Sequence, residues 1–178
     1  MPGLDVGFVQ IYTGNGKGKT TAAIGLSLRA LGHGLKVMFI QFMKDFPYSE
    51  LTMMDEFPPE LFSLFRFGND DFVINKKKPD ETDRDSIRDG IALARQAVSS
   101  GQYDLVVLDE INVCPYFGLI EPEDLLPVFK AKKPEVELVL TGRYCPDIWL
   151  EKADLISDVT EVKHYYNQGV LSRRGIDS

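Results

Sequence analysis

A glycine-rich loop between an apolar strand and a helix constrains this chain more than any other feature. The loop reads Thr-Gly-Asn-Gly-Lys-Gly-Lys-Thr-Thr over residues 13–21. A buried strand before it is predicted by the apolar residues Val6, Phe8, Val9, Ile11 and Tyr12. Because glycine adopts positive φ at little cost, the backbone can wrap around phosphate oxygens at the start of the helix. The stretch therefore predicts a phosphate-binding loop of the Walker A type.

Two side chains of the loop suit a nucleotide. Lys19 adds a mobile positive charge, and the Thr20 hydroxyl is placed to ligate a phosphate-bound Mg²⁺. The strict pattern G-x-x-x-x-G-K-[ST] has glycine where this chain has Thr13, but glycines follow at 14, 16 and 18 in the same strand–loop–helix context. The alternative is a tight glycine turn that binds nothing.

The composition is that of an ordinary globular chain. With 178 residues and 44% hydrophobic residues it can bury a substantial core, and we expect a single domain over residues 1–178. Twenty Lys and Arg against 27 Asp and Glu give a formal net charge of −7, which argues against a nucleic-acid partner. We find no signal peptide and no apolar run long enough for a membrane span, so the sequence predicts a cytoplasmic protein.

Strands and helices alternate along the chain. Helices are expected over 19–31, 80–99, 123–130 and 146–152, and further strands over 36–42, 61–67, 105–108, 136–140 and 155–161. The first helix is apolar on all sides, which predicts that it is buried. Residues 43–59 show no regular pattern, and residues 69–78 are expected to form a loop. The alternation predicts an α/β protein: a three-layer, P-loop NTPase-like fold with a mainly parallel sheet.

Charged residues follow two of the expected strands. Asp109 and Glu110 come directly after strand 105–108, and Arg143 follows strand 136–140. The carboxyl ends of parallel strands meet at one edge, where ligands bind, so we expect these residues beside the glycine loop. The two acids can hold Mg²⁺ directly or through water, and the guanidinium fork suits phosphate oxygens. The alternatives are plain strand ends and, for Arg143, a surface salt bridge.

The end of the sequence indicates a particular family. Residues 162–169 (Val-Lys-His-Tyr-Tyr-Asn-Gln-Gly) and 174–177 (Arg-Gly-Ile-Asp) resemble the C-terminal signature of the P-loop class of ATP:cob(I)alamin adenosyltransferases. That family also has the loop Thr-Gly-Asn-Gly-Lys-Gly-Lys-Thr-Thr. The similarity continues through Val-Leu-Asp-Glu at 107–110, Thr-Gly-Arg at 141–143 and Ala-Asp-Leu at 153–155, and so covers almost the whole chain.

The resemblance implies a specific reaction and its participants. The Co(I) centre of a reduced corrinoid attacks the 5′ carbon of ATP, forms adenosylcobalamin or adenosylcobinamide, and expels triphosphate. The implied partners are ATP, the corrinoid, Mg²⁺ or Mn²⁺, a second copy of the chain in a homodimer, and a reductase that donates electrons. The net charge and the lack of a long apolar run predict no nucleic-acid partner and no membrane association.

The resemblance also implies roles for individual residues. Nucleotide contacts are expected from Gly14, Asn15, Gly16, Lys17, Gly18, Lys19, Thr20 and Thr21, and a contact with the nucleotide or the corrinoid is expected from His164. The metal would be held by Thr20, Asp109 and Glu110, with Glu110 as the direct ligand. The implied catalytic residues are Lys19, Glu110, Arg143 and Phe72. A purely structural histidine is the alternative for His164.

One stretch departs from the family pattern. Relatives often carry Phe-x-Trp in a mobile loop, where the aromatic pair displaces the lower axial ligand of cobalt, but this chain has Phe72-Val73-Ile74.

Two other functions stay open. The first is a P-loop nucleoside kinase, which would need a base for the nucleoside hydroxyl, and none is evident. The second is a nucleotide-gated module that binds corrinoid without transferring a group.

Overall fold

A parallel sheet forms the middle layer of the structure, a computed structural model that describes residues 3–44, 48–69 and 78–177. Its strands are β1 (Val9–Thr13), β2 (Val37–Phe42), β3 (Phe62–Phe67), β4 (Leu105–Asp109), β5 (Glu137–Thr141) and β6 (Leu155–Asp158), in the order β3-β2-β4-β5-β1-β6. Every strand pair is parallel.

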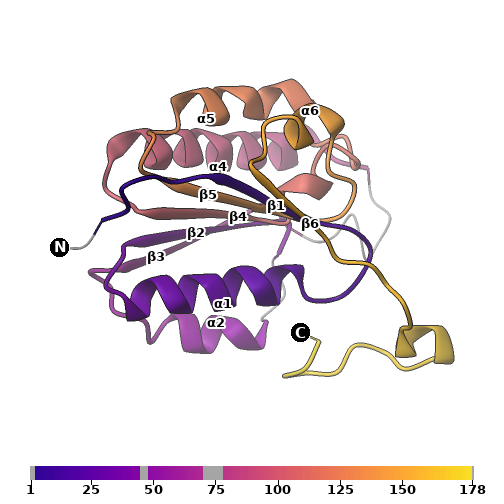
Figure 1. The fold of residues 1–178 in the computed structure, drawn as a ribbon. Helices are drawn as coiled ribbons and strands as arrows, with labels where there is room; N and C mark the ends of the chain where they lie inside the picture. Colours follow the sequence, from indigo (N-terminus) through magenta and orange to yellow (C-terminus); the bar gives the residue numbers. More distant parts are fainter. Residues whose placement is uncertain (1–2, 45–47, 70–77, 178) are drawn as a thin grey trace.

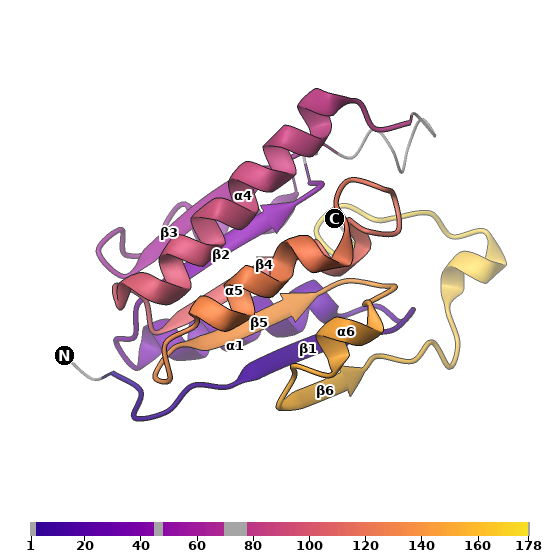
Figure 2. The ribbon, with the colours of Figure 1, turned by 90° about the horizontal axis from the view of Figure 1, so that it is seen from above.

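Helices cover both faces of this sheet. The helices α1 (Lys19–Gly32) and α2 (Ser49–Met54) lie on one face, and α4 (Glu81–Ser100), α5 (Leu126–Ala131) and α6 (Asp147–Leu150) lie on the other (Figures 1 and 2). The predicted three-layer α/β fold is confirmed. The two long helices and the four strands from β2 to β5 begin and end within one residue of their expected positions.

The sheet is buried on both sides, and this explains its continuous apolar strands. Successive residues of a strand point to opposite faces. Phe39, Val107 and Val139 pack toward α1, whereas Ile40 and Leu108 pack on the side of α4. The second side also contains Trp149, which is fully buried and donates its Nε1–H to the Pro122 carbonyl at 2.7 Å.

The helix α4 has clear signals at both ends. The Asp80 side chain accepts a hydrogen bond from the Asp83 N–H, and the Asp83 side chain accepts one from the Asp80 N–H. This reciprocal cap satisfies N–H groups that have no partner within the helix. The helix stops at Gly101, whose φ of +73° is left-handed. Its buried face contains Ile87, Ile91, Ala94 and Val98.

Two predictions of burial were wrong. Val6 and Phe8 precede β1, and 54% and 48% of their surfaces are exposed, because this segment lies before the sheet pairing starts at Val9. The helix α1 is not buried all round either. Leu28 is 58% exposed and Ala22 is exposed, because α1 belongs to an outer layer and only one of its faces meets the sheet.

Three element predictions also needed correction. The helix expected over 123–130 divides into a 3-10 turn, Pro122–Leu125, and α5, because Pro127 has no N–H to donate to the preceding turn. The irregular region 43–59 contains α2. The last strand, β6, ends at Asp158 and is exposed along its length, as an edge strand with only one neighbour in the sheet.

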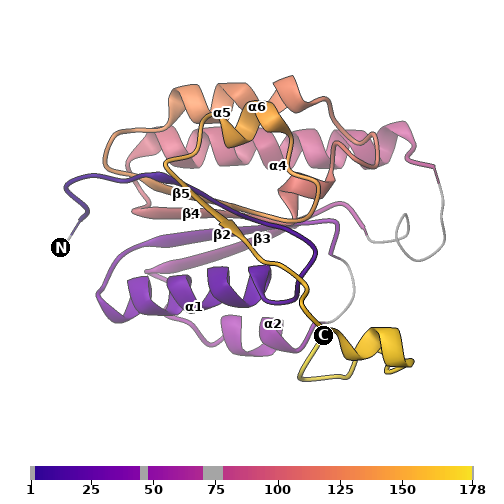
Figure 3. The same cartoon turned by 45° about the vertical axis from the view of Figure 1, so that its right-hand side comes forward.

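The topology brings the predicted site to one edge of the sheet. The glycine loop follows β1, while β4 and β5 end beside it, so the end of β5 lies between the loop and Asp109. Beyond β6, the chain runs past the glycine loop toward the C-terminus (Figure 3). Among the described residues, no helix has the length and apolarity that a bilayer span requires.

Candidate active site

The glycine loop has a backbone that only glycine can adopt at two positions. Gly14 and Gly18 have φ values of +93° and +121°. A Cβ on Gly14 would also lie 2.1 Å from the Asp158 carboxylate, so the loop packs too closely against the end of β6 for any side chain there. Thr13 is the last residue of β1 and pairs with Asp158. The position where the strict pattern has glycine is therefore part of the strand here.

Lys19 is folded back into the loop. Its Nζ donates to the carbonyls of Gly14 at 2.8 Å and Gly16 at 2.7 Å, and only 6% of the residue is exposed. Burial lowers the pKa of Lys19, and the nearby Glu110 carboxylate opposes that shift. The loop thus holds a positive charge at its centre.

Asp109 is the hub of a buried polar network. Its carboxylate accepts hydrogen bonds from the hydroxyls of Thr20 at 2.9 Å and Thr141 at 2.7 Å, and from the Lys44 ammonium at 2.8 Å. None of its surface is exposed. Lys44 also donates to the Thr20 hydroxyl at 3.0 Å. The network ties the glycine loop to the ends of β2, β4 and β5.

Glu110 is held in a different way. Its backbone is left-handed, with a φ of +62°, and its N–H donates to the Thr141 hydroxyl at 3.0 Å. Its carboxylate lines the cavity and makes no hydrogen bond within the described part of the chain. Burial, together with the neighbouring Asp109 charge, raises the pKa of Glu110. Because the Glu110 carboxylate has no hydrogen-bond partner among the described residues, it can bind a cation or a hydrogen-bond donor in the cavity.

A cavity of about 750 Å³ opens at this edge of the sheet. The predicted site residues that line it are Gly16, Lys17, Gly18, Lys19, Thr20, Thr21, Glu110, Arg143 and His164. The cavity lining does not include Gly14, Asn15 or Asp109, and Phe72 lies outside the described residues. Within the residues 3–44, 48–69 and 78–177, the Arg143 guanidinium makes no hydrogen bond or salt bridge. A surface salt bridge is thus not its role there.

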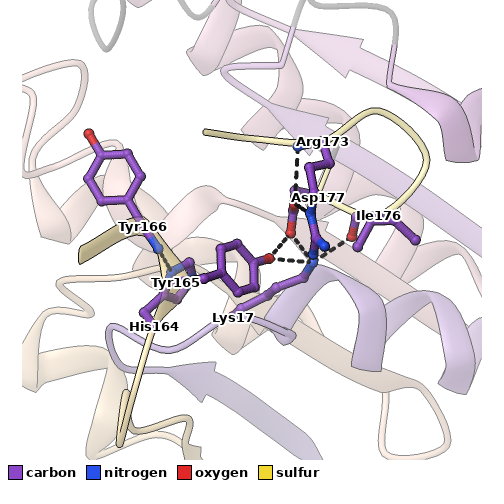
Figure 4. A network of polar contacts seen from close by, with 7 residues as sticks. All are labelled: Lys17, His164, Tyr165, Tyr166, Arg173, Ile176 and Asp177. Atoms are coloured by element: carbon purple, nitrogen blue, oxygen red, sulfur yellow. Dashed lines mark hydrogen bonds and ion pairs between the residues drawn. The ribbon is translucent and has the colours of Figure 1, made fainter. Parts of the chain in front are cut away.

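The C-terminal segment forms another wall of the cavity and contacts Lys17 (Figure 4). The Lys17 ammonium donates to the Tyr165 hydroxyl, the Ile176 carbonyl and the Asp177 carboxylate. Arg173 also donates to Asp177, and its guanidinium lies 4.6 Å from the centre of the Tyr165 ring. The bond from Lys17 holds the pKa of the Asp177 carboxyl well below its usual range. In this structure Lys17 is therefore neutralised by the chain itself.

His164 combines features of both interpretations that the sequence left open. Its Nδ1 accepts a hydrogen bond from the Tyr166 N–H at 3.1 Å, and its ring packs on Tyr165 with 4.6 Å between ring centres. The residue also lines the cavity. It therefore stabilises the turn at 165–168 and remains accessible to a ligand.

Sequence reasoning missed Lys44 and the part played by Asp177. Lys44 stands two residues beyond the end of β2, at the same carboxyl edge as Asp109. The strand-end argument that selected Asp109 would have selected Lys44 as well. Asp177 follows no strand, and its contact with Lys17 spans 160 positions of sequence, so no local pattern could indicate it.

Comparison with known proteins identifies the family of this chain. Residues 5–178 match the family "ATP:corrinoid adenosyltransferase BtuR/CobO/CobP". The corrinoid adenosyltransferase of Escherichia coli (strain K12) is 33% identical over 96% of this chain and 85% of its own length. The corresponding enzymes of Salmonella typhimurium and Pseudomonas aeruginosa are 31% and 30% identical, over 96% of this chain and 85% and 83% of their own lengths. The chain therefore belongs to the ATP:corrinoid adenosyltransferase family and is a transferase.

Proposed function

We propose that this protein transfers the 5′-deoxyadenosyl group of ATP to the Co(I) centre of a reduced corrinoid and releases triphosphate. The cobalt supplies the electron pair of the new cobalt–carbon bond. The bond between C5′ and its oxygen breaks, and that oxygen leaves with its electrons on the triphosphate. The observation that carries the proposal is the convergence of the glycine loop, Glu110 and Arg143 on one cavity of about 750 Å³.

The residues of the cavity suit a triphosphate leaving group. Lys19 is fixed by two loop carbonyls, and Arg143 lines the same cavity. Because Lys19 is positioned before the reaction, it can stabilise the charge that develops on the leaving oxygen without reorganising, and Arg143 supplies a second cation. Backbone N–H groups at the start of α1 add positive potential at the same place.

A magnesium ion fits the donors at this edge. Thr20, Asp109 and Glu110 offer the hydroxyl and carboxylate oxygens that Mg²⁺ prefers. The Asp109 oxygens already accept bonds from Lys44 and Thr20, so we assign the direct contact to Glu110 and a supporting role to Asp109. When bound, Mg²⁺ would neutralise part of the charge on the triphosphate.

The products distinguish this function from its alternatives. The protein is incubated without oxygen with ATP, Mg²⁺ and chemically reduced corrinoid, and cobalt alkylation is followed spectroscopically. We expect alkylated corrinoid and triphosphate in equal amounts. ADP in place of triphosphate would indicate a kinase or an ATPase. Intact ATP with bound corrinoid would indicate a binding module.

The contact between Lys17 and Asp177 leads to a further prediction. Asp177→Asn should tighten ATP binding by about 2- to 5-fold, because it removes a carboxylate that competes with phosphate for Lys17. The effect is small because an ion pair that is partly exposed to water contributes little free energy. Isothermal titration calorimetry measures the change. Asp85→Asn is the matched control, since Asp85 forms an exposed pair with Arg88 on α4. Weaker binding by Asp177→Asn alone would mean that the tail presents Lys17 to the nucleotide instead of occupying it.

Phe72 lies outside the described residues, so its proposed role rests on the family resemblance. Apolar side chains beneath the corrin would exclude the lower axial ligand and ease reduction of Co(II). We expect Phe72→Ala to slow the reaction that starts from Co(II) corrinoid much more than the reaction with Co(I). Ile74→Trp should leave the Co(II) route unchanged or improve it. Equal slowing of both routes, with lower thermal stability, would show that Phe72 only anchors its segment.

The remaining partners are also proposals. By resemblance to the family, we propose that the protein is a homodimer and that a reductase supplies the electron for Co(I). Sedimentation equilibrium tests the first statement, and reduction assays with purified flavoprotein reductases test the second.

A further inference from the structure

Lys44 is a buried lysine that the proposal above does not use. Only 8% of the residue is exposed, yet it lines the cavity beside Lys19 and Glu110. Its ammonium lies 2.8 Å from the Asp109 carboxylate and 3.0 Å from the Thr20 hydroxyl. It thus stands between the glycine loop and the acid at the end of β4. Through its bond to Thr20, the ammonium lies at the glycine loop that we propose binds the triphosphate.

The hydrogen bonds of Lys44 leave it capacity for a ligand. A lysine ammonium carries three N–H donors, and the described residues accept two of them. The ring of Tyr48, 5.2 Å away, flanks the ammonium and also lines the cavity. Within the part of the chain that the structure describes, one donor therefore remains for a group inside the cavity.

The backbone of Lys44 is fixed as well. Arg66, on β3, donates from Nε at 3.0 Å and from Nη2 at 2.5 Å to the Lys44 carbonyl. Both ends of the lysine are thus held, the carbonyl by Arg66 and the ammonium by Asp109 and Thr20. A cation that is held before the ligand arrives loses little freedom on binding it.

We propose that Lys44 is a triphosphate-binding residue, which completes with Lys19 and Arg143 a set of three cations around the leaving group. The inference rests on the proposed function, because it assigns one more contact to the same triphosphate. On this view Asp109 has a second task, which is to hold the Lys44 ammonium in position beside the cavity. The competing interpretation is a structural ion pair, in which Lys44 only compensates the buried Asp109 charge.

Binding of inorganic triphosphate in EDTA tests the contact without metal, corrinoid or turnover. We expect Lys44→Met to weaken this binding by roughly 10- to 100-fold, as for loss of a hydrogen bond between charged groups. Lys132→Met is the matched control, because Lys132 is partly buried and donates to three backbone carbonyls near the opposite ends of the strands. Equal affinities for the two variants would overturn the proposal.

A double variant separates binding from structure. Lys44→Met alone leaves the Asp109 charge buried without its partner, and this can destabilise the fold. Lys44→Met combined with Asp109→Asn removes both charges and is compared with Asp109→Asn alone. If Lys44 contacts phosphate, the double variant binds triphosphate at least about 10-fold more weakly than Asp109→Asn. Equal binding by the two would show that Lys44 is only a structural partner.

The Lys19→Ala variant separates failure of the Lys44 proposal from failure of the proposed triphosphate site. If Lys19→Ala weakens triphosphate binding and Lys44→Met does not, the triphosphate site stands and only the role of Lys44 is wrong. If neither variant weakens binding, the triphosphate site itself is wrong, and the proposed function loses its main support.

Discussion

Replacing Lys19 with alanine should lower the rate of cobalt alkylation by on the order of 10² or more, because it removes a preorganised charge from the leaving triphosphate. The structure explains the size of the effect. The Lys19 ammonium is fixed by the carbonyls of Gly14 and Gly16, and the residue lines the cavity, so its charge is in place before the leaving group forms. Initial rates under anaerobic conditions, with saturating ATP and pre-reduced corrinoid, measure the change.

The fold should survive this substitution, because the contacts of Lys19 are confined to the glycine loop. Thermal unfolding followed by circular dichroism checks this expectation. Lys132→Ala provides the comparison, since it removes another lysine that donates to backbone carbonyls, far from the cavity. A Lys19→Ala rate within a few-fold of the parent would remove Lys19 from the mechanism.

Glu110→Gln should raise the apparent Mg²⁺ requirement and lower the rate by at least about 10- to 100-fold, the range that follows even the loss of a residue that only supports a metal ligand. The change keeps the shape of the side chain and removes the charge that the cation needs. The Glu110 carboxylate makes no hydrogen bond among the described residues, so little stability should be lost. Rates are titrated with Mg²⁺, and Mn²⁺ binding in the presence of ATP is measured by electron paramagnetic resonance.

Asp109→Asn is the variant to compare with Glu110→Gln. Its effect on the metal requirement should be comparable or smaller, but it should also destabilise the fold by about 3 kcal/mol, because the buried Lys44 ammonium loses its partner. Chemical denaturation measures that loss. If both variants titrate with Mg²⁺ and bind Mn²⁺ like the parent, the assignment of a metal to this strand end is wrong.

The sequence alone predicted the sheet and its long helices well, because burial on both faces leaves continuous apolar strands and α4 has a strong start and stop. The sequence did not predict which apolar residues face solvent. Val6 and Leu28 belong to apolar stretches, yet each is more than half exposed, and only the position of its segment relative to the sheet decides this. Exposure of single apolar residues is common in proteins, so hydropathy could not reveal it.

The same division holds for the candidate site. The order of residues was enough to predict that the glycine loop, Asp109 and Arg143 share one edge, because parallel strands place all their carboxyl ends there. Only the tertiary structure decided how the charges at that edge pair. Asp109 lies against Lys44, and Lys17 against Asp177, in contacts that join residues 65 and 160 positions apart. Such pairs depend on the path that the chain takes after each strand. That path is set by packing across the whole fold, and a local pattern of residues does not contain this information.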